Sequence, residues 1–385
     1  MHLILIATTI RSAAIGGLSV LFGLYLGSLG FDEFQIGLLI AAGLAGMAVG
    51  TGTAGFLADR LGRRKSLIVI SAVMALGGVL LALVESFLPV LLASFIGMVN
   101  GMGRDRGPAQ AIDQAILAQS VGPEHRTGAF SKYTLLQDIG TGVGSLLAGF
   151  TPPNYLPTAI FLYAGAVLVS ALFYPFMTAA VEATPGEERR VLSPASKKLV
   201  TRFAGLSMLD SLGGGFVTRA LLTYWFIQRF AVDPTWIGIL FGASSFINSL
   251  SYFVATWLAR RIGLVNTMVF THIPSSLFLM AVPFAPTFPI AMALFFLREF
   301  LSPMDLPTRQ SYLSAIVADH ERTAAAGFVN MVRNASWVVG PTLAGWAMTF
   351  SFAAPLFMAG TIKIVYDLLL WASFRTVKPP EEVGS

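Results

Sequence analysis

The sequence predicts an all-α integral membrane protein with twelve transmembrane helices, and three observations lead to that prediction. Hydrophobic side chains make up 55% of the 385 residues and charged ones only 12%, and the mean hydropathy is +0.73. Those values lie outside the range of soluble globular proteins. Apolar stretches of about 20 residues, the length that crosses a bilayer as a helix, recur along the chain. Basic residues gather in every second turn between these stretches.

In chain order, the apolar stretches of this length lie at about 3–28, 35–57, 66–84, 87–117, 128–150, 157–181, 201–228, 236–258, 266–284, 288–317, 324–348 and 353–374. Their connections are a few residues long, except for the polar segment EATPGEERRVLSPASKK (182–198) near the midpoint. We therefore expect a six-helix bundle at 1–181, a cytoplasmic linker at 182–200, a second six-helix bundle at 201–376 and a cytoplasmic tail at 377–385. The first stretch lacks a basic leader and a cleavage site, so we expect it to be retained as a helix.

The distribution of charge predicts the side of the membrane on which each turn lies. Even-numbered turns hold the basic residues Arg60, Arg63, Arg64, Lys65, Arg126, Lys132, Arg189, Arg190, Lys197, Lys198, Arg260, Arg261 and Arg322. Odd-numbered turns hold Asp32, Glu33, Glu85 and Asp233, with Arg229 as their basic residue. By the positive-inside rule, both termini and the even turns are cytoplasmic. The net charge of +5 therefore reports topology, and we assign it no nucleic-acid partner.

Several kinds of chemistry are excluded by residue types that the chain lacks. There is no cysteine, which removes disulfides, thiolate catalysis and cysteine metal sites. The four histidines are scattered without zinc-motif spacing. The segment NGMGRDRG (100–107) has glycines like a phosphate-binding loop, but no strand precedes it and no Lys-Ser/Thr follows. No nucleophile–His–acid set is visible either. We expect no enzymatic activity, no cofactor and no metal.

The two halves of the chain repeat each other. Residues 114–149 align without a gap on residues 310–345, at an offset of 196. Nearer the start of each half, LADRLG (57–62) matches LARRIG (258–263) at an offset of 201. Transporter folds are often built from duplicated halves, so two bundles of common ancestry are expected here.

A charged stretch, GFLADRLGRRKS (55–66), lies between the second and third predicted helices. Gly55 permits close helix approach, Gly62 can adopt a positive φ in a tight turn, and Asp59 can cap a neighbouring helix. Residues 55–64 match the G-x-L-a-D-r-x-G-r-k/r signature, so the chain resembles the major facilitator superfamily of secondary transporters. The twelve spans, the linker and the second copy of the signature extend the resemblance over essentially the whole chain. The resemblance implies two pseudo-symmetric six-helix bundles.

The resemblance also implies a conformational latch at the cytoplasmic face. In superfamily members the signature Asp contacts the start of helix 11, and an Arg pairs with an acid at the cytoplasmic end of helix 4. These roles fall on Asp59 and Arg63, with Asp113 as the partner acid. The expected latch residues are Gly55, Asp59, Arg60, Gly62, Arg63 and Asp113. A plain topology anchor is the alternative interpretation, and Arg260 and Arg309 replace the two acids in the second half.

Ionisable side chains inside a bilayer are costly, so they face partners or a water-filled cavity. By the resemblance, helices 1, 4, 5, 7, 8, 10 and 11 surround a central cavity, and most of the intramembrane charges lie on these helices. We expect this cavity to bind substrate and coupling protons through Arg11, Tyr25, Arg104, Asp105, Arg106, Tyr133, Asp138, Asp210, Arg219, Asn248, Arg298, Glu299 and Arg333.

Opposite charges occupy related positions in the two halves. The repeat places Arg11 opposite Asp210, which predicts that charges of the two halves face one another across the cavity. As proton-coupling groups we expect Asp138, Asp210 and Glu299, followed by Asp105, because burial and neighbouring arginines shift the pKa of a carboxyl in opposite directions. Structural salt bridges between helices are the alternative. Lys363 and Asp367, four residues apart on the last helix, are interpreted as such a pair.

Glycines and prolines interrupt several of the predicted helices. Gly213-Gly214-Gly215 predicts a broken segment in helix 7, and Pro303 and Pro307 predict a bend in helix 10. GTGVGSLLAG (140–149) and VGPTLAG (339–345) partly match the glycine–proline pattern of superfamily antiporters, such as the drug/proton antiporter branch. Helix packing by small residues explains the same pattern without a functional role.

These observations predict a multi-pass transporter of the cell membrane that works by alternating access. Its partners are the lipid bilayer, a small-molecule substrate and coupling protons, and we expect a monomer. The antiporter-like pattern favours proton-coupled efflux of a small organic compound. The alternative is uptake or facilitated diffusion of a polar or anionic metabolite, because arginines slightly outnumber acids on the cavity helices. A non-transporting membrane receptor is the third possibility.

Overall fold

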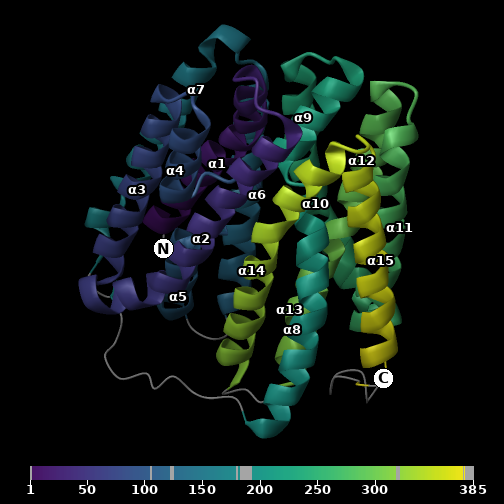
Figure 1. The fold of residues 1–385 in the computed structure, drawn as a ribbon. Coiled ribbons are helices and arrows are strands. Elements are labelled where there is room, and N and C mark those ends of the chain that lie inside the picture. The colour runs from purple at the N-terminus through teal and green to yellow at the C-terminus, as the bar shows by residue number, and fades with distance from the viewer. Residues whose placement is uncertain are drawn as a thin grey trace. The chain divides into compact units, whose positions relative to one another are not determined.

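The computed structural model describes residues 2–104, 106–121, 125–178, 181–182, 193–317, 321–375 and 377, with the backbone alone at 55, 59, 126, 127, 195 and 322–324. Within these residues the regular structure is helical and contains no strand. The α-helices of the first half are α1 (His2–Ser28), α2 (Glu33–Leu61), α3 (Arg63–Leu83), α4 (Phe87–Gly97), α5 (Pro108–Ser120), α6 (Arg126–Gly149) and α7 (Leu156–Ala171) (Figure 1).

The second half continues the same pattern of helices joined by short turns. Its helices are α8 (Pro194–Gly215), α9 (Arg219–Phe230), α10 (Pro234–Ile262), α11 (Leu264–Ala281), α12 (Phe288–Leu301), α13 (Asp305–Ala315), α14 (Arg322–Met348) and α15 (Ala354–Phe374). Among the described residues, seven helical segments are long and apolar enough to cross a bilayer. The chain is therefore a multi-pass membrane protein with an all-α fold.

Three predicted spans each contain two helices rather than one. The span predicted at 87–117 is broken between α4 and α5, where Met98 is left-handed (φ 56°) and Gly101 and Gly103 have positive φ. Arg104 and Arg106 therefore lie in a non-helical segment, which corrects their prediction as helix residues; Asp105 lies outside the described residues. Glycines that take positive φ end a helix at no steric cost, which accounts for the break.

The other two breaks were predicted from the sequence. Helix α8 ends at Gly215, and α9 begins at Arg219 after Thr218, whose hydroxyl accepts a hydrogen bond from the Leu221 amide at 3.4 Å. A 3₁₀ turn at Ser302–Met304 separates α12 from α13 at the predicted proline bend. In chain order, all three breaks fall in the fourth, seventh and tenth predicted spans, which the resemblance assigned to the cavity.

The repeat is visible in the turn geometry. Gly62 joins α2 to α3 with φ 83°, and Gly263 joins α10 to α11 with φ 84°, at the predicted offset of 201. An L-residue with a Cβ is strained at this φ, so both turns use glycine. The positive φ predicted for Gly62 is confirmed, and the two charged turns are structural equivalents.

Helix α8 begins at Pro194, seven residues before the predicted start of the second bundle at 201. Ser193 caps α8 through its hydroxyl, which accepts from the Ser196 amide at 3.4 Å, and Pro194 is the first helical residue. The Glu321 carboxylate adds hydrogen bonds from the Ser193 amide, at 2.5 Å, and from the Ser196 hydroxyl. Ser-Pro is a strong helix-start signal, so this boundary was readable from the sequence.

The chain divides into two compact units that differ from its sequence halves. The first unit comprises Met1–Pro185 and Thr218–Phe246, and the second comprises Gly186–Val217 and Ile247–Ser385. Helix α9 and the first half of α10 thus belong to the first unit, where α9 packs against α1. A Cβ on Gly23 of α1 would lie 2.2 Å from the carbonyl oxygen of Ala220, so glycine allows this contact.

Each unit has its own helix packing. In the first, α1 lies against α6 and α7, and α3 lies beside α4 and α7 (Figure 1). In the second, α8 packs between α14 and α15, and α11 lies beside α15 (Figure 1). Phe203, Tyr312 and Phe374 form an aromatic cluster in the core of the second unit, with the Phe203 and Phe374 ring centroids 5.5 Å apart. The charged groups considered next lie among these packed helices.

Candidate functional site

A fully buried ion pair lies in the first unit. Arg11 of α1 and Asp113 of α5 have no exposed surface, and Nη2 of Arg11 bonds Oδ2 of Asp113. Nη1 of Arg11 donates to the Tyr174 hydroxyl at 2.5 Å, and the Tyr133 hydroxyl donates to Asp113 at 3.2 Å. Within this pair the guanidinium charge balances the carboxylate charge. Such a pair fixes the packing of α1 against α5.

This ion pair corrects the predicted latch. Asp113 pairs with Arg11, whereas the Arg63 side chain donates to Oε1 of Gln119 at 2.5 Å and to the Val181 carbonyl at 3.2 Å. The reason is the start of α5 at Pro108, which places Asp113 inside the packed bundle with Gln119 near its end. Only the backbone is described at Gly55 and Asp59, so their predicted roles stay predictions. Arg60 stacks on Phe56, 4.2 Å from the ring centroid.

Glu182, just beyond the last helix of the first half, binds the signature turn instead. Its carboxylate accepts from the Arg63 amide at 2.5 Å and from Nε of Arg64 at 2.8 Å. It thereby caps the N-terminus of α3, where backbone amides lack helical partners. Although burial raises the pKa of Glu182, the hydrogen bonds from Arg64 and from the two backbone amides outweigh it and hold the pKa below its ordinary value.

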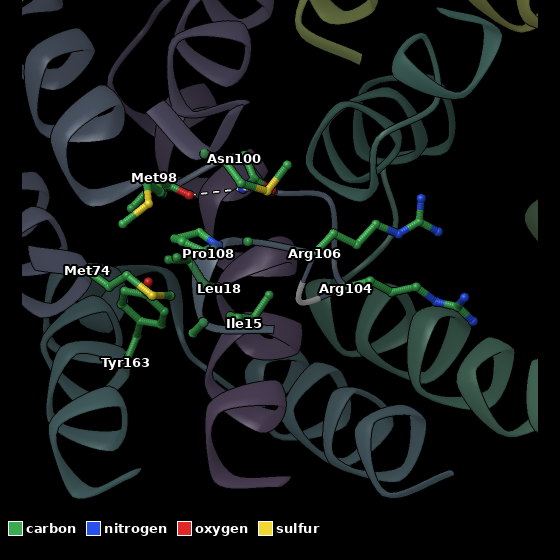
Figure 2. A pocket seen from close by; sticks show the side chains of 14 residues that line it. Ile15, Leu18, Met74, Met98, Asn100, Arg104, Arg106, Pro108 and Tyr163 are labelled. Atoms are coloured by element: carbon green, nitrogen blue, oxygen red, sulfur yellow. Dashed lines mark hydrogen bonds between the residues drawn. The ribbon is translucent and has the colours of Figure 1, made fainter. Parts of the chain in front are cut away.

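Basic side chains gather where two broken helices meet in the first unit. The amide of Ala220, at the start of α9, donates to the carbonyl of Gly101 in the break after α4 at 3.0 Å. Arg219 lies directly on that break, because a Cβ on Gly103 would be 2.2 Å from Cδ of Arg219. Figure 2 shows Arg104 and Arg106 extending from the same segment in a common direction, away from Met74 and Tyr163.

The partners of these arginines come from α6 and α10. Nη2 of Arg104 lies 3.2 Å from Oδ1 of Asp138, and Arg219 donates to the hydroxyls of Ser145 at 3.1 Å and Ser245 at 3.0 Å. The second oxygen of Asp138 is buried, and none of the described residues hydrogen-bonds it. Arginine is well suited to planar carboxylate and phosphate groups, so this cluster favours an anionic ligand.

The cavity beside this cluster is small. It is lined mainly by methionines and by the residues of the break, including Met47, Met74, Met98, Asn100 and Arg104 (Figure 2). Asn100 stabilises the break by donating to the Met98 carbonyl at 2.9 Å and accepting from the Met102 amide at 3.0 Å. The cavity has a volume of about 30 Å³, which holds about two water molecules. This cavity is therefore too small to hold an organic substrate.

The second unit contains a larger charge network centred on Asp210 of α8. Its Oδ1 accepts from Nζ of Lys363 at 2.7 Å, and its Oδ2 lies 3.1 Å from Nη1 of Arg333 and 3.2 Å from Nη1 of Arg309. Arg309 also bonds Asp305 at 2.6 Å, one turn earlier on α13. One carboxylate thus joins α8, α13, α14 and α15.

His272 of α11 extends this network, and sequence analysis missed it. Its Nδ1 lies 2.9 and 3.0 Å from the two carboxylate oxygens of Asp367, and its Nε2 lies 3.4 Å from Nζ of Lys363. The interpretation of Lys363 and Asp367 as a pair with each other is therefore wrong, since each contacts another helix. A buried histidine in an apolar helix, with a Lys and an Asp on a later helix, was the available signal.

The repeat conserves the buried pair but exchanges its charges. Arg11 aligns with Asp210, and Asp113 aligns with Arg309, so the α1–α5 pair of the first unit becomes an α8–α13 pair in the second. Arg11 and Asp210 each pair within their own unit, and the expectation that charges of the two halves face one another stays a prediction. Attraction depends only on the product of the two charges, so the exchange preserves it.

The remaining predicted residues divide between packing and polar pairing. The Tyr25 hydroxyl donates to the Leu81 and Val84 carbonyls at 3.0 Å each, so Tyr25 joins helices in this structure. On α12, Arg298 pairs with its neighbour Glu299, whose carboxylate also accepts from Nδ2 of Asn248 at 3.1 Å. The amide oxygen of Asn248 is buried without a hydrogen-bond partner among the described residues.

Broken helices and paired charges in the interior of an all-helical membrane protein are typical of transporters. The profile of the Major Facilitator Superfamily matches residues 4–228 and 203–385. The chain belongs to this superfamily, and it is a membrane transporter rather than an enzyme.

Known proteins agree with this assignment. An uncharacterized membrane protein of Saccharomyces cerevisiae, YJR124C, is 24% identical over 92% of this chain and 89% of its own length. The arabinose-proton symporter of Bacillus subtilis is 31% identical over 34% of this chain and 26% of its own. The 3-(3-hydroxy-phenyl)propionate transporter of Escherichia coli is 31% identical over 40% of this chain and 35% of its own. The crystal structure of the nucleoside transporter NupG shares the fold, with a TM-score of 0.77 at 15% identity, over 97% of this chain and 98% of that one.

Proposed function

We propose that the protein carries a small organic anion across the membrane by alternating access, coupled to protons, in the direction of uptake. The observation that supports it most is the group of arginines around the helix breaks of the first unit. Arg104, Arg106 and Arg219 come together there beside one described carboxylate, Asp138. Arginines held at helix breaks suit the recognition of a carboxylate or phosphate.

Incompletely bonded polar atoms support a ligand site in the same regions. Oδ2 of Asp138 in the first unit and Oδ1 of Asn248 in the second are buried, and no described residue hydrogen-bonds either atom. Buried polar atoms are nearly always satisfied, so a group that is absent here, such as water or substrate, is expected to bond them. Asp138 and Asn248 were both predicted as cavity residues.

The direction of transport rests on the role of the glycines. The antiporter-like pattern predicted efflux, but Gly144 on α6 packs directly on α1, where its Cβ would lie 1.8 Å from the Ala13 carbonyl oxygen. On α14, a Cβ on Gly340 would lie 2.4 Å from Cα of Gly215. Helix packing accounts for the pattern, so it no longer favours efflux. Two relatives with partial coverage, a proton symporter and a phenylpropionate transporter, favour uptake of a metabolite with protons.

Contacts between the sequence halves support the alternating-access part of the proposal. Within the first unit, the Tyr224 hydroxyl of α9 donates to Glu33 of α2 at 3.1 Å, and the backbones of Gly149 and Gly238 touch. These residues lie near turns with acidic residues, which the positive-inside rule places outside the cell. We infer that the two halves are closed on the external side in this structure, and that transport requires these contacts to open.

A flux assay tests the proposal directly. Purified protein in proteoliposomes, with an inward proton gradient, is offered labelled 3-(3-hydroxyphenyl)propionate, other small carboxylates, phosphate esters, arabinose and uridine. We expect accumulation of an anionic member of the panel, abolished by a protonophore and strongly reduced in R219Q. The matched control is R229Q, because Arg229 is exposed on the same helix. Accumulation of the neutral sugar or nucleoside alone would contradict the anion assignment, and proton-driven export would favour efflux instead.

A further inference from the structure

His272 connects two buried acids of the second unit, and neither the superfamily signature nor the arginine clusters account for it. The side chain is almost wholly buried on α11. Its Nδ1 faces both oxygens of Asp367, while its Nε2 faces Nζ of Lys363 at 3.4 Å and Oδ1 of Asp210 at 3.8 Å. The order Asp367, His272, Lys363, Asp210 forms a chain of contacts that starts on α15, passes through α11 and α15 and ends on α8.

The contacts of His272 determine which nitrogen is open to a proton. An ionised carboxylate can only accept hydrogen bonds, so the two short contacts with Asp367 require a proton on Nδ1. An ammonium can only donate, so the contact with Lys363 requires a lone pair on Nε2. A neutral imidazole with its proton on Nδ1 satisfies both partners. Nε2 is then the atom at which a second proton is taken up.

The charge balance around His272 supports this protonation state. The network consists of three carboxylates and three cations: Asp210, Asp305, Asp367, Arg309, Arg333 and Lys363. Helix α12 also packs against α11 and contributes Arg298 and Glu299, which pair with each other. Helix α15 contributes Tyr366, whose ring centroid lies 6.1 Å from that of His272. The network is neutral with a neutral imidazole. An added proton gives it a net positive charge that burial disfavours.

A proton on Nε2 changes the contacts of Asp210. The imidazolium repels the Lys363 ammonium, because its new N–H replaces the lone pair that faced Nζ. Once Lys363 withdraws, the acceptor within reach is Oδ1 of Asp210, which lies 3.8 Å from Nε2 and which Lys363 holds in this structure. Asp210 then moves toward His272 and away from Arg309 and Arg333, which share its other oxygen. The two guanidinium groups are left with positive charge to be balanced, and an anionic ligand supplies that balance.

We propose that His272 is the proton-binding residue of the transport cycle, taking up a proton on Nε2 as Arg309 and Arg333 take up an anionic group of the substrate. This inference rests on the proposed transport of an organic anion. It differs from the sequence-based expectation that Asp138, Asp210 or Glu299 carries the proton. Proton and anion enter together because each neutralises the charge that the other introduces, which is the thermodynamic condition for symport.

The protonation of His272 can be measured without any substrate. Full-length protein in nanodiscs, labelled with ¹⁵N-histidine and with His2, His125 and His320 replaced by Gln, gives one imidazole signal. We expect the tautomer with its proton on Nδ1 at high pH and the imidazolium at low pH. D367N removes a negative charge beside the imidazole, so the midpoint of the His272 titration moves to lower pH by about one unit or more. K363Q removes a positive charge, so the midpoint moves to higher pH. These opposite shifts separate a proton site from a merely structural histidine.

The control is T271V, next to His272 on α11. The Thr271 hydroxyl bonds the Thr267 carbonyl of its own helix at 2.8 Å, so its loss leaves the midpoint unchanged. A proton on Nε2 instead of Nδ1 at high pH overturns the proposal, as does an imidazole that does not titrate between about pH 4 and pH 9. Equal shifts in D367N and K363Q overturn it as well. If a variant does not fold, the tautomer and midpoint of the otherwise native network decide alone.

A transport assay then distinguishes the role of His272 from the proposed transport of an organic anion, on which that role rests. H272Q in proteoliposomes is expected to lose proton-driven accumulation of the transported anion while keeping exchange of labelled for unlabelled anion across the membrane. Proton-driven accumulation equal to that of the native protein overturns the role of His272. If no anion is transported by the native protein although His272 titrates as described, the proposed substrate class fails and the proton site stands.

Discussion

Buried charges in this protein are paired locally, and the pairs are equivalent between the repeats with their signs exchanged. Arg11 and Asp113 have no exposed surface, whereas Arg309 and Arg333 keep 7% and 8% of theirs. The first pair is thus sealed inside the helices, and the second retains access from outside the packing. In the proposed mechanism, the first pair has a structural role and the second exchanges one of its partners for ligand.

The sealed pair predicts a stability effect. D113N leaves the Arg11 guanidinium buried without a counter-charge, which is expected to lower the free energy of unfolding by about 3–5 kcal/mol. The exchanged variant, R11D with D113R, restores the pairing in the form used by the second half and is expected to recover part of the loss. Thermal unfolding of purified protein in detergent measures both. A D113N protein as stable as the native one would mean that Arg11 is solvated.

Glu182 predicts an effect of pH on stability. Its pKa is lower in the folded protein than its ordinary value of 4.5, so its contacts stabilise the fold above that value and are lost as pH falls through the folded pKa. The unfolding temperature of E182Q is expected to lie below that of the native protein at pH 7, with the two converging below about pH 4. R64Q combined with E182Q is expected to cost less than the sum of the two single changes, because the two side chains share one contact. If the unfolding temperatures of E182Q and the native protein differed by the same amount at all pH values, titration of Glu182 would be excluded as the cause.

The site residues were partly predictable. The sequence correctly identified Asp138, Asp210, Arg219 and Arg333 as buried, because charged residues in apolar spans rarely have another explanation. Their partners were not predictable, since spacing along one helix does not determine which neighbouring helix it faces. Lys363 and Asp367 illustrate this: their spacing of four places them on one helix face, but that face lies against α8 and α11.

At the scale of helices, the breaks organise the candidate site. The sequence predicted two of the three breaks, from a glycine triplet and from prolines, because these residues disfavour helix directly. It missed the break after α4, although Gly101 and Gly103 lie there in the polar segment NGMGRDRGP (100–108). Their positive φ angles depend on tertiary contacts with α9, which the local sequence does not reveal.

The break after α4 predicts a sensitive glycine. G103A introduces a Cβ at φ 79°, which costs about 1–2 kcal/mol, and places it against Arg219. We expect lower thermal stability together with a larger loss of anion flux, because Arg219 is displaced from Ser145 and Ser245. The control is G165A on α7, where a Cβ meets no atom within 4 Å, and this change is expected to leave flux unaltered. Equal anion flux in G103A and the native protein would show that transport does not depend on the position of Arg219.

At the scale of the molecule, the sequence predicted two repeated halves, and the structure shows two units whose boundaries differ from them. Helix α9 and the first half of α10 belong to the first unit because their backbones pack closely against that unit at Gly23, Gly142 and Gly149. A repeat describes ancestry, whereas contacts describe one conformation, so the two divisions need not agree. In an alternating-access cycle, the contacts between the halves are those that form and break.

The contact between α6 and α10 tests this directly, since the chain has no native cysteine. A Cβ on Gly142 would lie 3.2 Å from Cβ of Ser245, close to the spacing of about 3.5–4.5 Å in disulfides. The control joins α1 to α6 within the first half, where a Cβ on Gly140 would lie 3.2 Å from Cβ of Ser12 and 2.5 Å from the Thr9 carbonyl oxygen. Its uptake after oxidation is therefore compared with that of the same double variant before oxidation.

The measurement is the proton-driven uptake of the transported anion by proteoliposomes that contain G142C with S245C, before and after oxidation. Alternating access predicts that the disulfide stops uptake, that a reductant restores it, and that the oxidised S12C with G140C control continues to transport. Undiminished uptake by fully cross-linked G142C and S245C protein would contradict the account, because the two halves would not have to separate there.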